Sequence, residues 1–442
     1  MPRLRTLELM SALVPRHKIV KRVGRIRSLS ANIVSVAGLS DVASVGHRVV
    51  FPVAGVHGEV ISVGADCLNV LPDGALSDLR IGQAVQHLGE VSLYPDDSWL
   101  GRVLDGEGQP LDGEPLVNGP NKVGLHRPPP PAAERRHFGA RLDTGYALFN
   151  TMLPIVRGQR MGLFSGSGVG KSSLMAAFAA EMEADVVVIG LIGERGREVN
   201  QFVHRVLGTK GLERSVVIAS TSDKSALARR RAAFSAMAVA EHFRDQGRNV
   251  LLMIDSVTRL AEAHREIAST AGEPSTLRGF PPSMVNLLAG FAERAGPGTD
   301  GQGDITAIFT VLVSGSDMDE PVADTLRGLL DGHVVLSRNI AERGRFPAVD
   351  ILKSVSRSLP EAATEDENQL INAARQILNV YEDSEIMVRS GLYQPGASPE
   401  VDTAVALYPA LDAFAAGRAQ NGFDEAFNAL AQSLSPVQEG VG

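Results

Sequence analysis

Cysteine is almost absent from this chain of 442 residues, with Cys67 as its one example. A single cysteine excludes an internal disulfide and a zinc site built from cysteines, and it is typical of a reducing compartment. Long hydrophobic runs are also lacking, since no stretch approaches the ~18 apolar residues that cross a bilayer. The N-terminus has no signal-peptide core. We therefore expect a cytoplasmic protein without a membrane span.

Aromatic residues are scarce, at 5% of the chain, and Phe51 is the one aromatic among the first 90 residues. Proteins that hold single-stranded nucleic acid stack the bases on aromatic side chains. The formal net charge of −8 also disfavours nucleic-acid binding. The remaining composition, 44% hydrophobic and 21% charged, is that of a globular protein long enough for two or three domains. We expect no nucleic-acid partner.

Positive charge is concentrated at the N-terminus. Eight basic residues and one acid, Glu8, lie between Met1 and Arg27. Apolar residues recur there near helical spacing, at Leu4, Leu7 and Met10. This pattern predicts either an amphipathic segment that docks on a partner or on anionic lipid, or a solvated terminus. The sequence leaves both interpretations open.

The stretch RMGLFSGSGVGKSS (160–173) has the features of a phosphate-binding loop between a strand and a helix. Backbone N–H groups of such a loop point into one concavity at the positive end of the following helix. Lys171 would reach the β- and γ-phosphates, and the Ser172 hydroxyl would bind Mg²⁺. Ser165 stands where the strict pattern has glycine. We expect the nucleotide to contact Gly166, Ser167, Gly168, Val169, Gly170, Lys171, Ser172 and Ser173.

Two acidic residues follow other apolar runs. Asp255 ends NVLLMIDS, where an acid can hold Mg²⁺ or simply cap the next helix. Glu194 follows VVVIGLIG, at the sheet edge where the phosphate loop is expected, so its carboxylate can orient the attacking water. The alternative for Glu194 is an ion pair with Arg195 or Arg197.

The order of patterns along the chain predicts three parts. Short strands separated by turn residues fill the region from Lys18 to Gly89 and indicate a small β-barrel. Strands alternate with helices from Leu142 to Ser356, which predicts a parallel α/β sheet, and helices follow from about Glu361. Four prolines at 128–131 indicate a stiff connector. We expect domain boundaries at 1–95, 96–356 and 357–442.

Longer motifs add to this pattern. They are SGSGVGKS (165–172), GERGREV (193–199), the run from ITAIFTVL (305) to SVSR (357), and LYQPGASPEVDTAVALYP (392–409). Together they resemble the rotary-type hexameric ATPases, and within them the type III export ATPases of the flagellar branch. The resemblance covers almost the whole chain.

The resemblance implies roles for individual residues. Glu194 falls on the catalytic glutamate, with Arg195 beside it in the expected catalytic set. Lys171, Ser172 and Asp255 fall on the phosphate and metal ligands. Arg357 falls on an arginine finger that reaches the nucleotide of a neighbouring subunit; without the resemblance it would be read as a surface ion pair. Phe346 and Tyr393 fall near positions that pack on adenine, and plain core packing is the alternative.

The resemblance also implies a function and partners. It implies a homohexamer that uses ATP and Mg²⁺ to drive the export of flagellar proteins, by releasing or unfolding cargo from chaperones. It further implies a regulator or stator protein at the N-terminus, a central coiled-coil stalk, and an export gate that holds the enzyme at the inner membrane.

Four other functions remain as alternatives. The motifs are shared with the ATPase of a virulence injectisome. A catalytic subunit of a proton-translocating ATP synthase is disfavoured because such subunits carry a GERTREG-like form. Glu194 argues against a non-catalytic subunit, and the lack of aromatics argues against a rho-type translocase.

Overall fold

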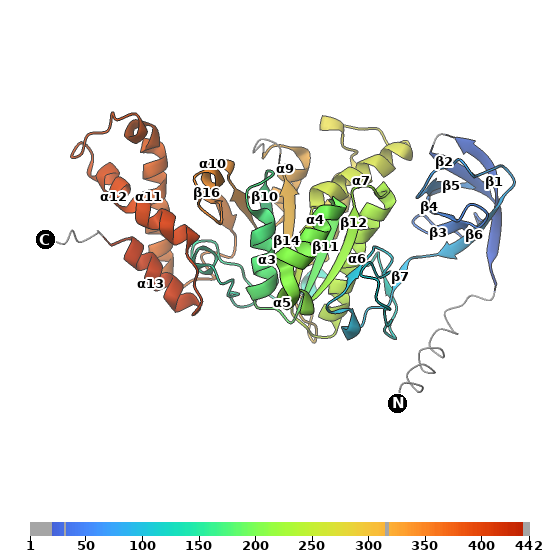
Figure 1. Cartoon of the computed structure of the whole chain (residues 1–442), viewed down its shortest axis with the longest axis horizontal. Helices are drawn as coiled ribbons and strands as arrows, with labels where there is room; N and C mark the ends of the chain where they lie inside the picture. Colours follow the sequence, from blue (N-terminus) through green and yellow to red (C-terminus); the bar gives the residue numbers. More distant parts are fainter. Residues whose placement is uncertain (1–19, 31, 314–317, 436–442) are drawn as a thin grey trace.

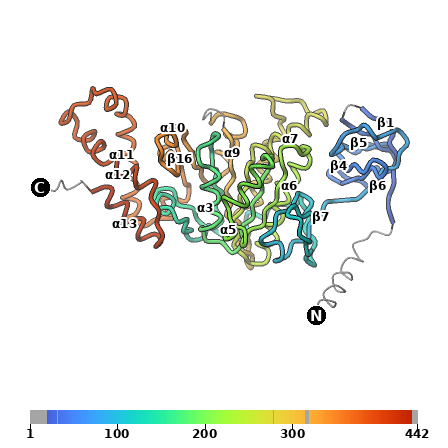
Figure 2. The backbone as a smooth tube through the Cα atoms, in the orientation of Figure 1, coloured from blue at the N-terminus to red at the C-terminus, as the bar shows by residue number. Residues whose placement is uncertain are grey.

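The computed structural model describes residues 20–30, 32–313 and 318–435. Its three parts follow one another along the long axis of the molecule (Figure 1): a barrel, a central sheet covered by helices, and a group of helices at the opposite end. The backbone trace in Figure 2 shows the same order from the N-terminus to the C-terminus. The expected three-part fold is confirmed.

The first part is a closed barrel with the strand order β1-β2-β5-β4-β3-β6. Alternate side chains of its strands point inward, and Val34, Val36 and Val70 are fully buried. The first 19 residues, which hold most of the basic N-terminal segment, lie outside the described residues. The strands are β1 (Arg22–Ser30), β2 (Ile33–Ala37), β3 (Arg48–Phe51), β4 (Val56–Val63), β5 (Cys67–Pro72) and β6 (Ala84–Gly89).

The second part is an eight-stranded sheet with the order β16-β15-β10-β14-β13-β11-β12-β8. All its neighbours are parallel except β15 and β16. The pair β7 (Ser92–Leu93) and β9 (Val123–Gly124) lies between the barrel and β10 along the chain. The sheet strands are β8 (Val103–Leu104), β10 (Arg160–Ser165), β11 (Val186–Glu194), β12 (Ser215–Thr221), β13 (Val250–Asp255), β14 (Ile305–Leu312), β15 (Gly332–Leu336) and β16 (Val349–Ser356).

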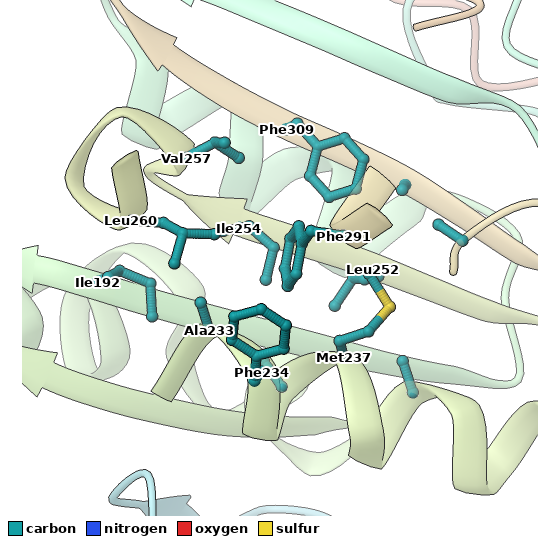
Figure 3. Close-up of a cluster of buried hydrophobic side chains, with 14 of the residues drawn as sticks. Ile192, Ala233, Phe234, Met237, Leu252, Ile254, Val257, Leu260, Phe291 and Phe309 are labelled. Atoms are coloured by element: carbon teal, nitrogen blue, oxygen red, sulfur yellow. The ribbon is translucent and has the colours of Figure 1, made fainter. Parts of the chain in front are cut away.

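The sheet is buried on both faces, which explains the continuous apolar runs in its strands. Val186 and Val188 pack with α6 and α8 on one face, where the rings of Phe234, Phe291 and Phe309 meet (Figure 3). Val187 joins the core of α3 and the C-terminal helices. The helices are α2 (Ala147–Asn150), α3 (Lys171–Glu181), α4 (Gly196–Gln201), α5 (Gly208–Glu213), α6 (Ala226–Asp245), α7 (Val257–Thr270), α8 (Ser283–Glu293), α9 (Pro321–Leu329) and α10 (Arg338–Glu342), with a π-helical turn at Phe202–Leu207.

Two strands of this sheet, β8 and β16, lack the continuous apolar runs from which the inner strands can be predicted. β16 lacks an apolar pattern because serines occupy two of its buried positions. Ser354 accepts a hydrogen bond from the N–H of Val335 at 3.0 Å, and the Ser356 hydroxyl donates to the carbonyl of Pro154 at 2.6 Å. The sheet is therefore mixed at this edge, and not parallel throughout as expected.

The third part consists of α11 (Glu365–Arg389), α12 (Pro399–Ala416) and α13 (Phe423–Ser433). Thr364 and Glu367 form a reciprocal capping box that fixes the start of α11. Leu378 and Leu411 bury the apolar sides of α11 and α12 in the same core as α3. None of the helices in the described ranges is long and apolar enough to cross a membrane.

Candidate functional site

The glycine-rich loop connects the central strand β10 with α3, as the sequence predicts. Gly168 and Gly170 adopt φ angles of 77° and 85°, which side chains rarely tolerate. The loop thus curls around the N-terminus of α3, where backbone N–H groups and the helix dipole favour an anion. All eight loop residues predicted to bind nucleotide, from Gly166 to Ser173, line one cavity of about 830 Å³.

Lys171 and Asp255 meet beneath this loop. Asp255 ends β13 and is 4% exposed, and its carboxylate forms an ion pair with the Lys171 ammonium. The Thr310 hydroxyl donates to the same Asp255 oxygen at 2.7 Å. Because parallel strands end at the same edge of a sheet, two residues that are 84 positions apart come into contact.

Glu194 ends β11 at this edge and lines the same cavity. Burial raises the pKa of its carboxyl to about 7; the negative charge of Asp255 and a hydrogen bond with Glu198 add to the shift, while Lys171 opposes it. Conversely, the hydrogen bond from Glu194 lowers the pKa of Glu198. A carboxyl that titrates near neutral pH suits general acid–base chemistry.

Basic side chains that sequence reasoning missed line the cavity together with Glu194. The stem of Arg259 packs on Gly193, and its guanidinium donates to Glu262 at 2.7 Å. Arg229 donates to both carboxylate oxygens of Glu266 at 2.8 Å. Arg229, Arg259 and Arg265 come from α6 and α7 and line the cavity. The one sequence signal is that Arg259 lies in the first turn of the helix that follows Asp255.

Arg195 lines the cavity but points toward solvent. Its side chain is 76% exposed and forms a 3.4 Å ion pair with Glu198. The structure thus brings Arg195 to the mouth of the cavity, beside the candidate base, and its expected catalytic role stays a prediction.

The two residues expected at the adenine base lie in different places. Phe346 packs over the phosphate loop, because a Cβ on Gly170 would lie 3.0 Å from Phe346 Cδ1. The residue is 51% exposed, so part of its surface remains open to a ligand. Tyr393 follows α11 in the third part of the chain, and its hydroxyl donates to Asp402. Tyr393 does not line the cavity at the phosphate loop.

Arg357 lies at the end of the sheet opposite to the phosphate loop. β16 runs antiparallel, so Ser356 pairs with Gly332 at the start of β15, whereas the phosphate loop follows the end of β10. At ~3.3 Å per strand residue, this separation is on the order of 15 Å. The exposed guanidinium donates to the carbonyl of Arg327 at 3.1 Å, and no carboxylate pairs with it among the described residues. Arg357 is thus remote from the phosphate loop of its own chain.

The donor set at the phosphate loop fits Mg²⁺ bound together with a nucleotide. Within the described residues, no group of three or more His, Cys, Asp or Glu side chains could hold a metal ion by itself. Mg²⁺ in nucleotide sites is held by one or two protein oxygens together with phosphate oxygens and water. Exposed Ser172 and buried Asp255 supply one hydroxyl and one carboxylate at the loop.

Comparisons with known proteins identify relatives along the chain. Residues 145–356 match the ATP synthase alpha/beta family, nucleotide-binding domain, and residues 363–432 match the T3SS EscN ATPase C-terminal domain. The flagellum-specific ATP synthase of Caulobacter vibrioides is 43% identical over 93% of this chain and 95% of that protein.

Solved structures agree with these sequence matches. The assembled ATPase EscN of the enteropathogenic E. coli type III secretion system is 35% identical, with a TM-score of 0.86 over 93% of this chain and all of that chain. EscN in complex with its central stalk EscO gives a TM-score of 0.85 at the same identity and the same coverage of both chains.

Proposed function

The chain belongs to the flagellum-specific ATP synthases, the ATPases of flagellar type III export within the ATP synthase alpha/beta family, and on that premise we propose that it hydrolyses MgATP at sites completed by neighbouring subunits of a homohexamer. Hydrolysis would drive the export of flagellar proteins by releasing or unfolding cargo from chaperones. One observation carries the proposal. The cavity at the phosphate loop holds Glu194 and Lys171, whereas the exposed Arg357 lies at the other edge of the sheet.

Each residue has a chemical task in this site. Backbone N–H groups of the loop and Lys171 bind the phosphates and hold the γ-phosphoryl group in place. Glu194 accepts a proton from the attacking water, for which a pKa of about 7 is suitable. A guanidinium from Arg357 of an adjacent subunit would stabilise the charge on the transferring oxygens. Arg195 and Arg259 line the cavity beside Glu194 and add positive charge there.

Ser172 and Asp255 would hold the Mg²⁺ that accompanies the nucleotide. When bound, the ion neutralises charge on the phosphate oxygens. Lys171 already contacts Asp255, so this carboxylate lies within reach of a ligand on the loop. Phe346 would pack on the base, and we keep Tyr393 as a weaker second candidate, since it contacts Asp402 in the C-terminal part.

We place the partners on different parts of the chain. A regulator or stator would bind the basic N-terminal segment, which would also contact anionic lipid when the enzyme is at an export gate on the inner membrane. A coiled-coil stalk would contact the C-terminal helices. Residues 361–435 carry twelve acids and three basic residues, so a stalk with a basic surface would fit them. Domain boundaries near 95 and 356 follow the ends of β6 and β16.

Steady-state ATP hydrolysis as a function of protein concentration tests this proposal. If neighbouring subunits complete each site, the specific activity of the purified chain rises steeply with concentration and then reaches a plateau. The Lys171→Ala variant is expected to show negligible activity at every concentration. Specific activity that is independent of concentration while the oligomer forms would contradict a shared site.

A further inference from the structure

The segment between β15 and β16 joins the candidate nucleotide site to the C-terminal helices. It contains α10 and the turn Arg343–Pro347. On one side, Arg338 donates to the carbonyl of Ser167 in the phosphate loop at 3.4 Å, and Phe346 packs over Gly170. On the other side, the segment faces α11 and α12 (Figure 1). A movement of this segment therefore moves Phe346 relative to the loop.

Arg345 occupies the side that faces the helices. Its side chain is 9% exposed, and its Nε lies 3.0 Å from a carboxylate oxygen of Asp412 on α12. Its two Nη groups donate to the carbonyls of Pro347 and Val349 at 3.3 and 2.8 Å. One buried guanidinium thus holds the backbone directly after Phe346, at Pro347 and Val349, and links it to α12.

A cavity of about 540 Å³ separates the segment from α11 and α12, and stacked rings of Tyr381 and Tyr408 lie on its wall with a centroid distance of 3.6 Å. The second ionic contact across the cavity, from Arg343 to Glu385 of α11, is 3.4 Å long and its arginine is 48% exposed. Exposed pairs of that kind contribute little to stability, whereas a buried arginine with three partners fixes geometry.

We propose that Arg345 is a positioning residue that sets Phe346 against the base of the bound nucleotide according to the position of α12. The inference rests on the proposed nucleotide site at the phosphate loop. Arg345 does not line the cavity at the phosphate loop, so it acts on nucleotide affinity and leaves the chemical step unchanged. Movement of the C-terminal helices then changes the affinity for the base through Asp412.

The test compares Arg345→Ala with Arg343→Ala in the full chain. Arg343 is the matched control, because it lines the same cavity and pairs with α11 but holds no backbone near Phe346. We expect Arg345→Ala to raise KM for MgATP about tenfold with kcat within about twofold. Arg343→Ala should leave both parameters within about twofold of the wild-type values. Equal effects of the two variants, or a loss confined to kcat, would overturn the proposal.

A ligand without a base separates positioning of Phe346 from damage to the loop. Inhibition by magnesium tripolyphosphate should keep its Ki in Arg345→Ala, because this ligand makes no contact with the base position. A tenfold weaker Ki, matching the rise in KM, would show a distorted phosphate loop and contradict the role assigned to Arg345.

Two further variants keep the test informative if Arg345→Ala fails to fold. Arg345→Lys retains the buried stem and the charge but lacks the fork that reaches two carbonyls. Asp412→Asn removes the link to α12 alone, and its rise in KM should disappear when Arg345 is already substituted. Independent, additive effects would overturn the coupling. The ATPase activity of the wild-type chain tests the proposed function. The Arg345 variants test only how KM differs from the wild-type value, so the two proposals can fail separately.

Discussion

The Glu194 carboxyl gives the site a pH dependence. Its pKa of about 7 arises mainly from burial and then from the charge of Asp255. A general base must be deprotonated, so kcat/KM for ATP hydrolysis should fall about tenfold per pH unit below ~7 and level off above it. The profile of kcat/KM against pH measures this, because that ratio reports on the free enzyme.

The control for this profile is Glu194→Gln. We expect this variant to bind MgATP with nearly unchanged affinity and to hydrolyse it about 10³-fold more slowly, without the acid limb of the wild-type profile. If the wild-type profile is flat between about pH 6 and pH 8, or if Glu194→Gln hydrolyses ATP normally, Glu194 is not the base.

Two glycines of the phosphate loop provide a matched pair of substitutions. Both adopt a positive φ, so alanine at either position strains the backbone by about 1 kcal/mol. A Cβ on Gly168 meets nothing within 4 Å, whereas one on Gly170 lies 3.0 Å from Phe346. Gly170→Ala should therefore weaken nucleotide binding more than Gly168→Ala.

Titration with a fluorescent ATP analogue measures the difference between the two glycine variants. Phe346→Ala should remove the extra loss of Gly170→Ala, because the crowded ring is then absent. Equal losses at both glycines would place Phe346 away from the loop in solution.

Some residues of the candidate site could be predicted from the sequence and others could not. The loop from Gly166 to Ser173 is contiguous, so its spacing predicted the whole cradle. Arg229 and Arg259 line the same cavity as Glu194 from two separate helices, and no local pattern relates them to it. Their role as lining residues depends on how α6 and α7 pack on the sheet, which is a property of the tertiary structure.

At the level of elements, a buried ionic cluster joins the barrel to α6. Glu59 of β4 accepts hydrogen bonds from Arg230 at 2.7 Å and from Arg231 at 2.9 Å, and its side chain is 9% exposed. Arg231 also pairs at 3.0 Å with Glu107, which lies between β8 and β9. Arg231→Ala leaves the buried Glu59 carboxylate with Arg230 as its remaining partner and should destabilise the fold by about 2 kcal/mol.

Thermal unfolding measures this loss. Glu183→Gln is the control, because Glu183 pairs with Arg157 at the surface and 62% of its side chain is exposed. The loss of this pair should lower the free energy of unfolding by less than about 1 kcal/mol. Equal stability of Arg231→Ala and wild type would mean that the barrel does not depend on this cluster for its position.

The edge strand β16 could not be predicted from the pattern of apolar residues in the sequence. The barrel and the inner strands were predictable because their apolar residues alternate or run continuously. β16 buries serines, and only the antiparallel pairing with β15 reveals that Arg357 lies at the edge remote from the phosphate loop. The resemblance implied a role for Arg357 in a neighbouring subunit, and the topology shows that Arg357 is remote from the phosphate loop of its own chain.

For the molecule as a whole, the resemblance recognised across nearly the full chain is confirmed by relatives that match it over a similar length. Within a single chain, however, Arg357 lies far from the phosphate loop and Glu194, although all three belong to the proposed active site. If Arg357 acts in trans, each subunit contributes its phosphate loop and Glu194 to one active site. It contributes Arg357, from the opposite end of its sheet, to the site of a neighbouring subunit. This arrangement makes subunit mixing a decisive measurement.

Mixing two inactive variants tests the arrangement. Glu194→Gln subunits retain Arg357, and Arg357→Ala subunits retain Glu194, so an interface between the two kinds can hold one complete site. Each variant alone should be nearly inactive with nucleotide affinity largely intact. Random co-assembly at equal amounts should restore activity to about a quarter of the wild-type value, since one interface in four is complete.

The matched control mixes Glu194→Gln with Lys171→Ala. Both residues line the cavity of one chain, so no interface between these variants contains a complete site, and activity should stay negligible. Mass measurement of the mixtures establishes that the oligomers contain both variants. If co-assembled Glu194→Gln and Arg357→Ala chains remain inactive while the wild type is active, Arg357 does not serve the neighbouring site. If both mixtures recover equally, the recovery reflects general stabilisation of the oligomer and the division of the site between subunits is refuted.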